Sequence, residues 1–144
     1  MGIQFTSKKV GELLKEGNLR IPSYQRPYKW NRKHIRNLFY DLRDAMGKKE
    51  YQVGFVILHE NDGYLDIVDG QQRLISISLF LYLLDDFEDY KGANQLLSAE
   101  FGELSCYHAS ENYNEWKNLT QLVGENQAKD ICNFLLENCS VSVI

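Results

Sequence analysis

The chain has 144 residues, of which 44% are hydrophobic and 25% charged, and this composition is typical of one folded domain rather than a disordered segment. Its net charge of -4 conceals an uneven distribution, because residues 1–50 hold 12 Lys and Arg against 5 Asp and Glu, whereas residues 51–144 hold 4 against 15. No apolar run approaches the roughly 18 residues of a membrane span, and the first residues lack a signal-peptide core, so we expect a cytoplasmic protein with no membrane partner.

The three cysteines give no sign of a metal centre or a disulfide framework. Cys106, Cys132 and Cys139 are odd in number and lack the close paired spacing of a zinc site. We therefore expect free thiols in a reducing compartment.

The first third of the chain alternates short elements with one aromatic loop. A helix is expected over 6–16 and a short strand over 19–21, with a proline-bracketed loop following at 23–30. Asn31 is a favourable N-cap for the next helix, 32–46, whose apolar residues recur at helical spacing and predict one buried face.

The middle of the chain reads as a hairpin that leads into a long helix. An apolar strand is expected over 51–58, the Asn-Asp-Gly turn at 61–63 reverses the chain, and a second strand returns over 64–68. The apolar helix that follows is expected over 71–85.

The last third is expected to be mainly helical. It reads as a helical turn at 93–98, helices at 110–122 and 126–137, and a strand that begins at 140 and is still apolar at 144. A strand interrupted in this way leads us to expect a single domain, 1–144, truncated at its carboxy end. The fold class is α+β: a small sheet of four or five strands with helices 32–46 and 71–85 packed on it.

The turn between the second hairpin strand and the long helix carries the chemistry. It reads Asp69-Gly70-Gln71-Gln72-Arg73. A glycine lets the backbone approach a ligand, a helix start offers unpaired N–H groups, and an arginine one turn in can grip a phosphate. This residue pattern predicts phosphate binding, although it matches neither the Walker loop nor the Rossmann glycine motif.

Asp69 has two interpretations that the sequence leaves open. As a helix N-cap it would form a capping box with Gln72 and stabilise the helix by about 1 kcal/mol. As a functional group it would hold a phosphate-bound Mg²⁺, or orient Arg73 or a water.

A second candidate group lies in the aromatic loop. Arg26, beside Tyr24 and Gln25, is suited to bind phosphate while a ring stacks on a base. The competing interpretation is a hydrophobic clamp that pins the loop to the core. Trp30 is assigned to the core, because it precedes the Asn31 cap as a staple residue does.

The basic first third suggests a polyanionic partner, either a nucleotide or a nucleic acid. Lys29, Arg32, Lys33 and Arg36 would lie along DNA phosphates. The alternative is a solvated face that pairs with the acidic half of the chain. His34, on the polar side of helix 32–46, is expected to be solvated.

Three stretches together are recognisable. Residues 21–30 (IPSYQRPYKW), 53–58 (VGFVIL) and 67–74 (IVDGQQRL) closely resemble the amino-terminal domain of GmrSD-type restriction endonucleases, which is related to the ParB/sulfiredoxin fold. The resemblance covers residues 5–90 well and the helical part, 91–138, weakly. It implies a ParB-like small mixed sheet with helices packed against it.

The resemblance also implies a function: an NTP-binding and hydrolysing module in defence against foreign, often modified, DNA. Asp69, Gln71, Gln72 and Arg73 would line the site of ATP or GTP with its Mg²⁺, and Arg26 with Gln25 would approach it. Relatives usually carry the nuclease in a separate carboxy-terminal domain, and nothing in this chain resembles one.

Two functional hypotheses follow, beside a third possibility of a scaffold whose site has decayed and which serves as a protein-interaction domain. In the first, a nucleotide-dependent regulatory domain uses Asp69 to hold the metal or the attacking water, while Arg73 and Arg26 neutralise phosphate charge. In the second, the chain is a ParB-like DNA-binding module without turnover.

Overall fold

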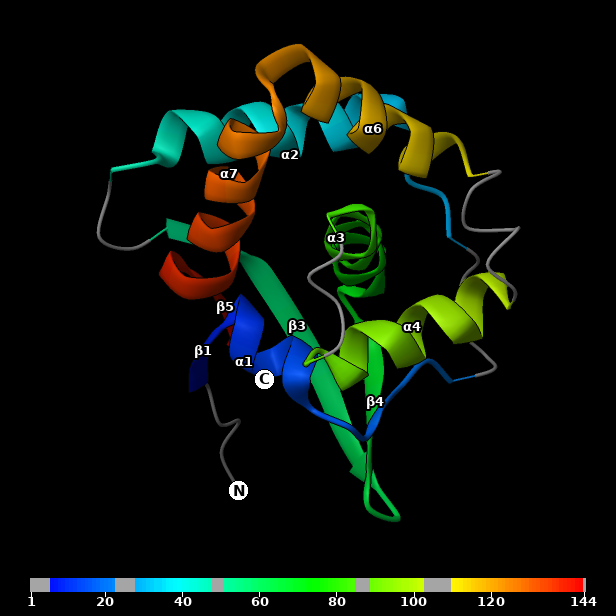
Figure 1. Ribbon diagram of the computed structural model, residues 1–144. Helices are drawn as coiled ribbons and strands as arrows, with labels where there is room; N and C mark the ends of the chain where they lie inside the picture. Colours follow the sequence, from blue (N-terminus) through cyan, green and yellow to red (C-terminus); the bar gives the residue numbers. More distant parts are fainter. Residues whose placement is uncertain (1–5, 23–27, 48–50, 85–88, 103–109, 144) are drawn as a thin grey trace.

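The computed structural model describes residues 6–22, 28–47, 51–84, 89–102 and 110–143 (Figure 1). The strands are β1 (Thr6–Lys9), β2 (Leu19–Arg20), β3 (Tyr51–Asn61), β4 (Tyr64–Asp69) and β5 (Cys139–Val143). The helices are α1 (Val10–Lys15), α2 (Arg32–Ala45), α3 (Gln71–Leu83), α4 (Lys91–Phe101), α6 (Glu111–Val123) and α7 (Glu125–Asn138).

One mixed sheet joins the two ends of the described chain. Its strand order is β1-β5-β3-β4-β2, so β5 pairs with β1 on one side and with β3 on the other. The β3–β4 and β1–β5 pairs are antiparallel, whereas β3–β5 and β2–β4 are parallel. The predicted α+β fold, with a small mixed sheet and a helical second half, is confirmed.

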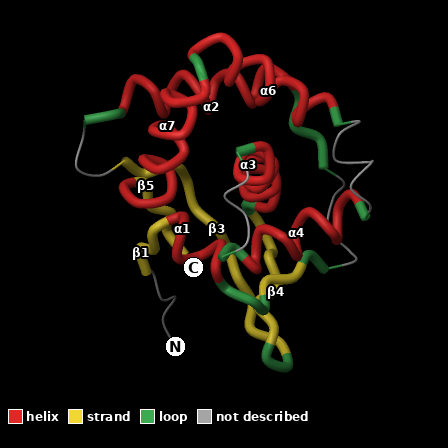
Figure 2. Tube along the Cα trace, viewed as in Figure 1, coloured by secondary structure: helices red, strands yellow, loops and turns green. Residues whose placement is uncertain are grey.

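Helix α3 forms the centre of the core. Its residues from Leu74 to Leu81 are buried, which is the pattern of a helix surrounded by other elements. It packs against α4 and α6, and Figures 1 and 2 show it enclosed by the other helices, with the strands on one side of the molecule. The hydroxyls of Ser76 and Ser78 donate back to the carbonyls of Gln72 and Leu74, so two polar groups are accommodated inside this core. No helix among the described residues is long and apolar enough to cross a membrane.

Two predictions about elements need correction. The first helix is shorter than 6–16, because residues 6–9 form β1 in pairing with β5, a partner more than 130 residues away that local pattern does not reveal. The helical turn expected at 93–98 is a complete helix, α4. The strand expected from 140 is confirmed as β5, and it lies between two partners inside the sheet.

Candidate functional site

The turn from β4 into α3 is built on Gly70. Its backbone is left-handed, with φ of +100°, and it occupies the N-cap position of α3. A Cβ placed there would lie 2.9 Å from the carbonyl oxygen of Phe55 and 3.2 Å from the Cα of Val56. Glycine is therefore required both by the backbone angle and by the close approach of β3. The result is that α3 begins directly against the middle of that strand.

Of the two interpretations of Asp69, the structure contradicts the helix N-cap. Its carboxylate oxygen Oδ1 accepts the N–H of the adjacent Gly70, at 2.8 Å, and makes no capping hydrogen bond to the first turn of α3. Because Gly70 takes the N-cap position, the helix starts one residue later than a cap at Asp69 would require. The Asp69 side chain is exposed, and its predicted role as a metal ligand remains a prediction.

The two glutamines of the turn lie in different environments. Gln71 is 3% exposed and belongs to the buried part of α3. Gln72 is half-buried, and its side-chain oxygen Oε1 accepts the backbone N–H groups of Lys29 and Trp30, at 2.7 and 3.1 Å. Gln72 therefore holds the end of the aromatic loop onto the first turn of α3.

Arg73 extends from the first turn of α3 into a pocket. Its guanidinium lies 5.6 Å from the ring centroid of Trp30. It also passes so close to Gly54 of β3 that a Cβ there would overlap its Nη1 atom. The Nε atom is buried and has no hydrogen-bond partner among the described residues. Arg73 also makes no ion pair with any residue that the structure describes. The pocket therefore contains a cation that the described residues leave unneutralised.

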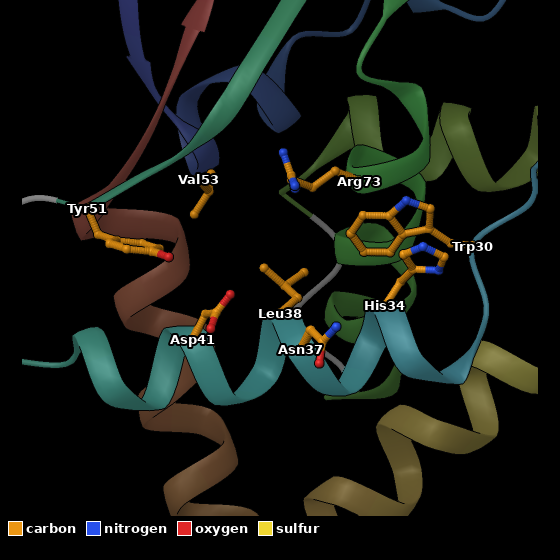
Figure 3. Close-up of a pocket in the computed structure, with 8 residues that line it drawn as sticks. All are labelled: Trp30, His34, Asn37, Leu38, Asp41, Tyr51, Val53 and Arg73. Atoms are coloured by element: carbon orange, nitrogen blue, oxygen red, sulfur yellow. The ribbon is translucent and has the colours of Figure 1, made fainter.

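This pocket lies between α2, β3 and α3 and has a volume of about 230 Å³. Figure 3 shows its side chains converging from these elements and from the end of the aromatic loop. The lining residues are Trp30, His34, Asn37, Leu38, Asp41, Tyr51, Val53 and Arg73. Of the five residues of the turn, only Arg73 is among them.

The hydroxyl of Tyr51 experiences both charges of the pocket. Burial raises its pKa, the carboxylate of Asp41 raises it further, and the guanidinium of Arg73 lowers it. Tyr51 therefore remains a neutral hydroxyl at physiological pH, able to donate a hydrogen bond to a ligand.

Trp30 and His34 form one wall of the pocket. Their rings stack, with centroids 5.1 Å apart and planes 19° apart. The predicted core position of Trp30 is partly right, because the half-buried ring packs against the core cluster and also faces the pocket. Asn31 is the N-cap of α2, as predicted, and His34 completes a capping box by accepting the Asn31 N–H at its Nδ1, at 3.1 Å. His34 is exposed, as expected.

A hydrogen-bond network from α6 fixes the same loop end from the other side. Asn112 donates through Nδ2 to the hydroxyl of Tyr28 and to the carbonyl of Trp30, both at 2.7 Å. The Tyr28 hydroxyl also lies 2.6 Å from the hydroxyl of Ser76 on α3, and burial raises the pKa of Tyr28. The clamp interpretation of the loop therefore applies to Tyr28, whereas the predicted site residues Tyr24, Gln25 and Arg26 lie outside the described residues.

Sequence reasoning missed four residues of this site: Gly54, Asn37, Asp41 and Tyr51. His34, Asn37 and Asp41 recur at the spacing of one helical face, but such a polar face is indistinguishable in sequence from a solvated one. The half-buried position of Tyr51 and the contact of Gly54 with Arg73 depend on long-range packing.

The basic face of α2 is partly neutralised by α6. Arg32 pairs with Glu111 at 2.7 Å, and Arg36 pairs with Glu115 at 3.4 Å. These contacts favour the interpretation of a basic segment that pairs with the acidic half of the chain. No group of three metal-ligating side chains occurs among the described residues.

No curated protein matches the chain. The family model of the GmrSD restriction endonuclease N-terminal domain matches residues 10–142. Because this match spans most of the 144 residues, the chain belongs to the GmrSD N-terminal domain family of restriction and phage-defence proteins.

Proposed function

We propose that this domain binds a nucleoside triphosphate with Mg²⁺ and hydrolyses it, as the regulatory part of a restriction or phage-defence protein. The observation that carries the proposal is Arg73: a guanidinium held in a pocket, with a buried Nε that lacks a hydrogen-bond partner among the described residues. A buried N–H donor without a hydrogen-bond partner is costly unless an acceptor joins it. A phosphate, with several acceptor oxygens, supplies that acceptor.

The surroundings of Arg73 suit a nucleotide. Arg73 lies in the first turn of α3, so a phosphate that it binds would be close to the positive end of the helix dipole. The stacked rings of Trp30 and His34 place an aromatic surface beside the guanidinium, of the kind that base or ribose recognition uses. The pocket thus places a phosphate-binding group next to an aromatic surface.

For hydrolysis, the chain contributes charge stabilisation. Arg73 would neutralise the negative charge that develops on the transferred phosphoryl group, and Mg²⁺, when bound, shields the phosphate oxygens. The carboxylates of Asp69, at the start of α3, and Asp41, in the pocket, are the candidates for its protein ligand. We place DNA cleavage in a separate nuclease domain or subunit.

The proposal is tested by calorimetric titration of ATP and GTP, each with Mg²⁺, into the domain. Arg73→Ala should weaken binding about 10- to 100-fold, the effect of losing charge-assisted hydrogen bonds to phosphate, and Arg73→Lys should restore part of it. Arg43→Ala is the matched control, because it removes the same charge from the last turn of α2, outside the pocket. A folded Arg73→Ala protein with wild-type affinity would overturn the assignment.

A further inference from the structure

Two opposite charges face the same pocket without pairing. Asp41 reaches it from α2 and Arg73 from α3, and Figure 3 shows both side chains directed into the space between these elements. Neither forms an ion pair with the other, or with a third group, within the residues that the structure describes. A carboxylate and a guanidinium that share a pocket but remain apart leave room for a group that contacts both.

Tyr51 supports this arrangement independently of the pocket's shape. Its hydroxyl experiences the field of Asp41, which raises its pKa, and the field of Arg73, which lowers it. Both charges are therefore close to one position in the pocket. In Figure 3 the Tyr51 hydroxyl and the Asp41 carboxylate are directed toward each other.

The size of the pocket limits what lies between the two charges. At about 230 Å³ it is smaller than the roughly 300–1,000 Å³ of typical small-molecule sites, so it admits only part of a nucleoside triphosphate. A phosphate bound to Arg73 would be repelled by Asp41 at short range. A divalent cation between the phosphate and the carboxylate removes this repulsion.

We propose that Asp41 is the protein ligand of the nucleotide's Mg²⁺, with Arg73 on the phosphate that the metal contacts. Mg²⁺ is commonly held by one or two carboxylates together with substrate phosphates and water, rather than by a protein cage. A single well-placed carboxylate is therefore sufficient, even though the described residues contain no group of three ligands. This inference rests on the proposed function and assigns the metal to Asp41 in preference to Asp69, which does not line the pocket and accepts the Gly70 N–H.

The test compares Asp41→Asn with wild type in titrations of ATP, GTP and inorganic pyrophosphate, each with and without Mg²⁺. Asp41→Asn should weaken Mg²⁺-dependent binding of all three by roughly tenfold or more. Without Mg²⁺ it should leave binding unchanged or tighten it, because the carboxylate no longer repels phosphate. Asp44→Asn is the control, since it makes the same chemical change about one turn along α2, outside the pocket.

The other outcomes are distinct. A loss confined to GTP and independent of Mg²⁺ would mean that Asp41 reads the donor edge of guanine, and would overturn the metal assignment. An equal effect with and without Mg²⁺, or no effect, would overturn it too. If wild type binds Mg²⁺-pyrophosphate through Asp41 but neither nucleotide, the metal assignment stands and the proposed function fails. If wild type binds none of the three probes, both fail.

Discussion

The side chain of Gln72 holds the backbone of Trp30. Its Oε1 atom accepts the N–H groups of Trp30 and of the preceding Lys29, so the second residue of α3 positions the aromatic wall of the pocket, and the next residue, Arg73, lies beneath that wall. Gln72 and Arg73 thus contribute to the same pocket in two ways. One residue supplies the charge, and the other positions the ring beside it.

Replacing Gln72 should therefore release Trp30 without disrupting the core. Gln72→Met keeps the length of the side chain but removes the acceptor, and should cost about 1 kcal/mol of unfolding free energy, because the two N–H groups are partly accessible to water. Gln72→Glu retains an acceptor and should keep Trp30 in place. We expect weakened nucleotide binding in Gln72→Met and near-normal binding in Gln72→Glu.

Acrylamide quenching of tryptophan fluorescence measures this effect directly. The chain has two tryptophans, and Trp116 is fully buried, donating its Nε1–H to the carbonyl of Ser76 at 2.8 Å. The quenchable signal therefore reports Trp30. Quenching should increase in Gln72→Met, and also in Tyr28→Phe, which removes the hydroxyl bound by Asn112. Unchanged quenching in both variants would contradict the positioning role.

Gly54 should be needed for the position of Arg73. Its φ is +148°, and a Cβ at this position would occupy the space of the Arg73 Nη1 atom, so any side chain displaces the guanidinium. Gly54→Ala should reduce nucleotide affinity nearly as much as Arg73→Ala, while unfolding free energy falls by about 1 kcal/mol. Gly63→Ala is the control, because it is also at positive φ but has no atom within 4 Å of its Cβ. Equal affinities for the two glycine variants would contradict this role.

The sequence was sufficient to predict those features that depend on residues close together in the chain. Asn31 was predicted as the N-cap of α2 because capping is a local interaction: its side-chain oxygen accepts the N–H groups two and three residues ahead. The hairpin was predicted because its turn residues are adjacent in the sequence. The two interpretations of Asp69 stayed open in the sequence, because the position of the N-cap at Gly70 depends on the contact with β3, 14 to 15 residues earlier. The same limit applies to the pocket: Arg73 was identified from its motif, whereas Asp41 and Tyr51 enter only through the packing of α2 and β3 against α3.

The Arg20–Asp66 pair should make stability depend on pH. The two residues face each other across the parallel β2–β4 pair, and Arg20 binds the carboxylate through two nitrogens, at 2.6 and 3.1 Å. This hydrogen bonding holds the pKa of Asp66 below its usual value, which is about 3.9 in unfolded chains. The unfolded state therefore binds the proton first as pH falls, and the folded state loses this stabilisation.

Chemical denaturation at several pH values tests this linkage. Asp66→Asn should be less stable than wild type at pH 7, and the difference in unfolding free energy should stay constant down to about pH 5 and then shrink as pH falls through the lowered pKa. Asp44→Asn, on the exposed face of α2, serves as the control. A difference between Asp66→Asn and wild type that stays the same from pH 7 to pH 3 would contradict the role of this ion pair.

The ion pairs between α2 and α6 involve two of the arginines that the DNA-binding hypothesis needs. Arg32 pairs with the exposed Glu111 and Arg36 with the buried Glu115, and an exposed pair such as Arg32–Glu111 stabilises by at most about 1 kcal/mol. If these arginines serve the α2–α6 contact, the double variant Arg32→Ala/Arg36→Ala should lower stability, mainly because the buried Glu115 loses its cation, and should leave DNA affinity and its salt dependence unchanged. If Arg32 and Arg36 instead leave their glutamate partners and bind DNA phosphates, the double variant should bind DNA with a weaker salt dependence. The slope of the logarithm of DNA affinity against the logarithm of salt concentration should then fall in magnitude by about 2. Fluorescence anisotropy with a labelled DNA duplex across a salt series separates the two results. A slope that falls in the double variant would favour the DNA-binding module over the nucleotide-dependent domain.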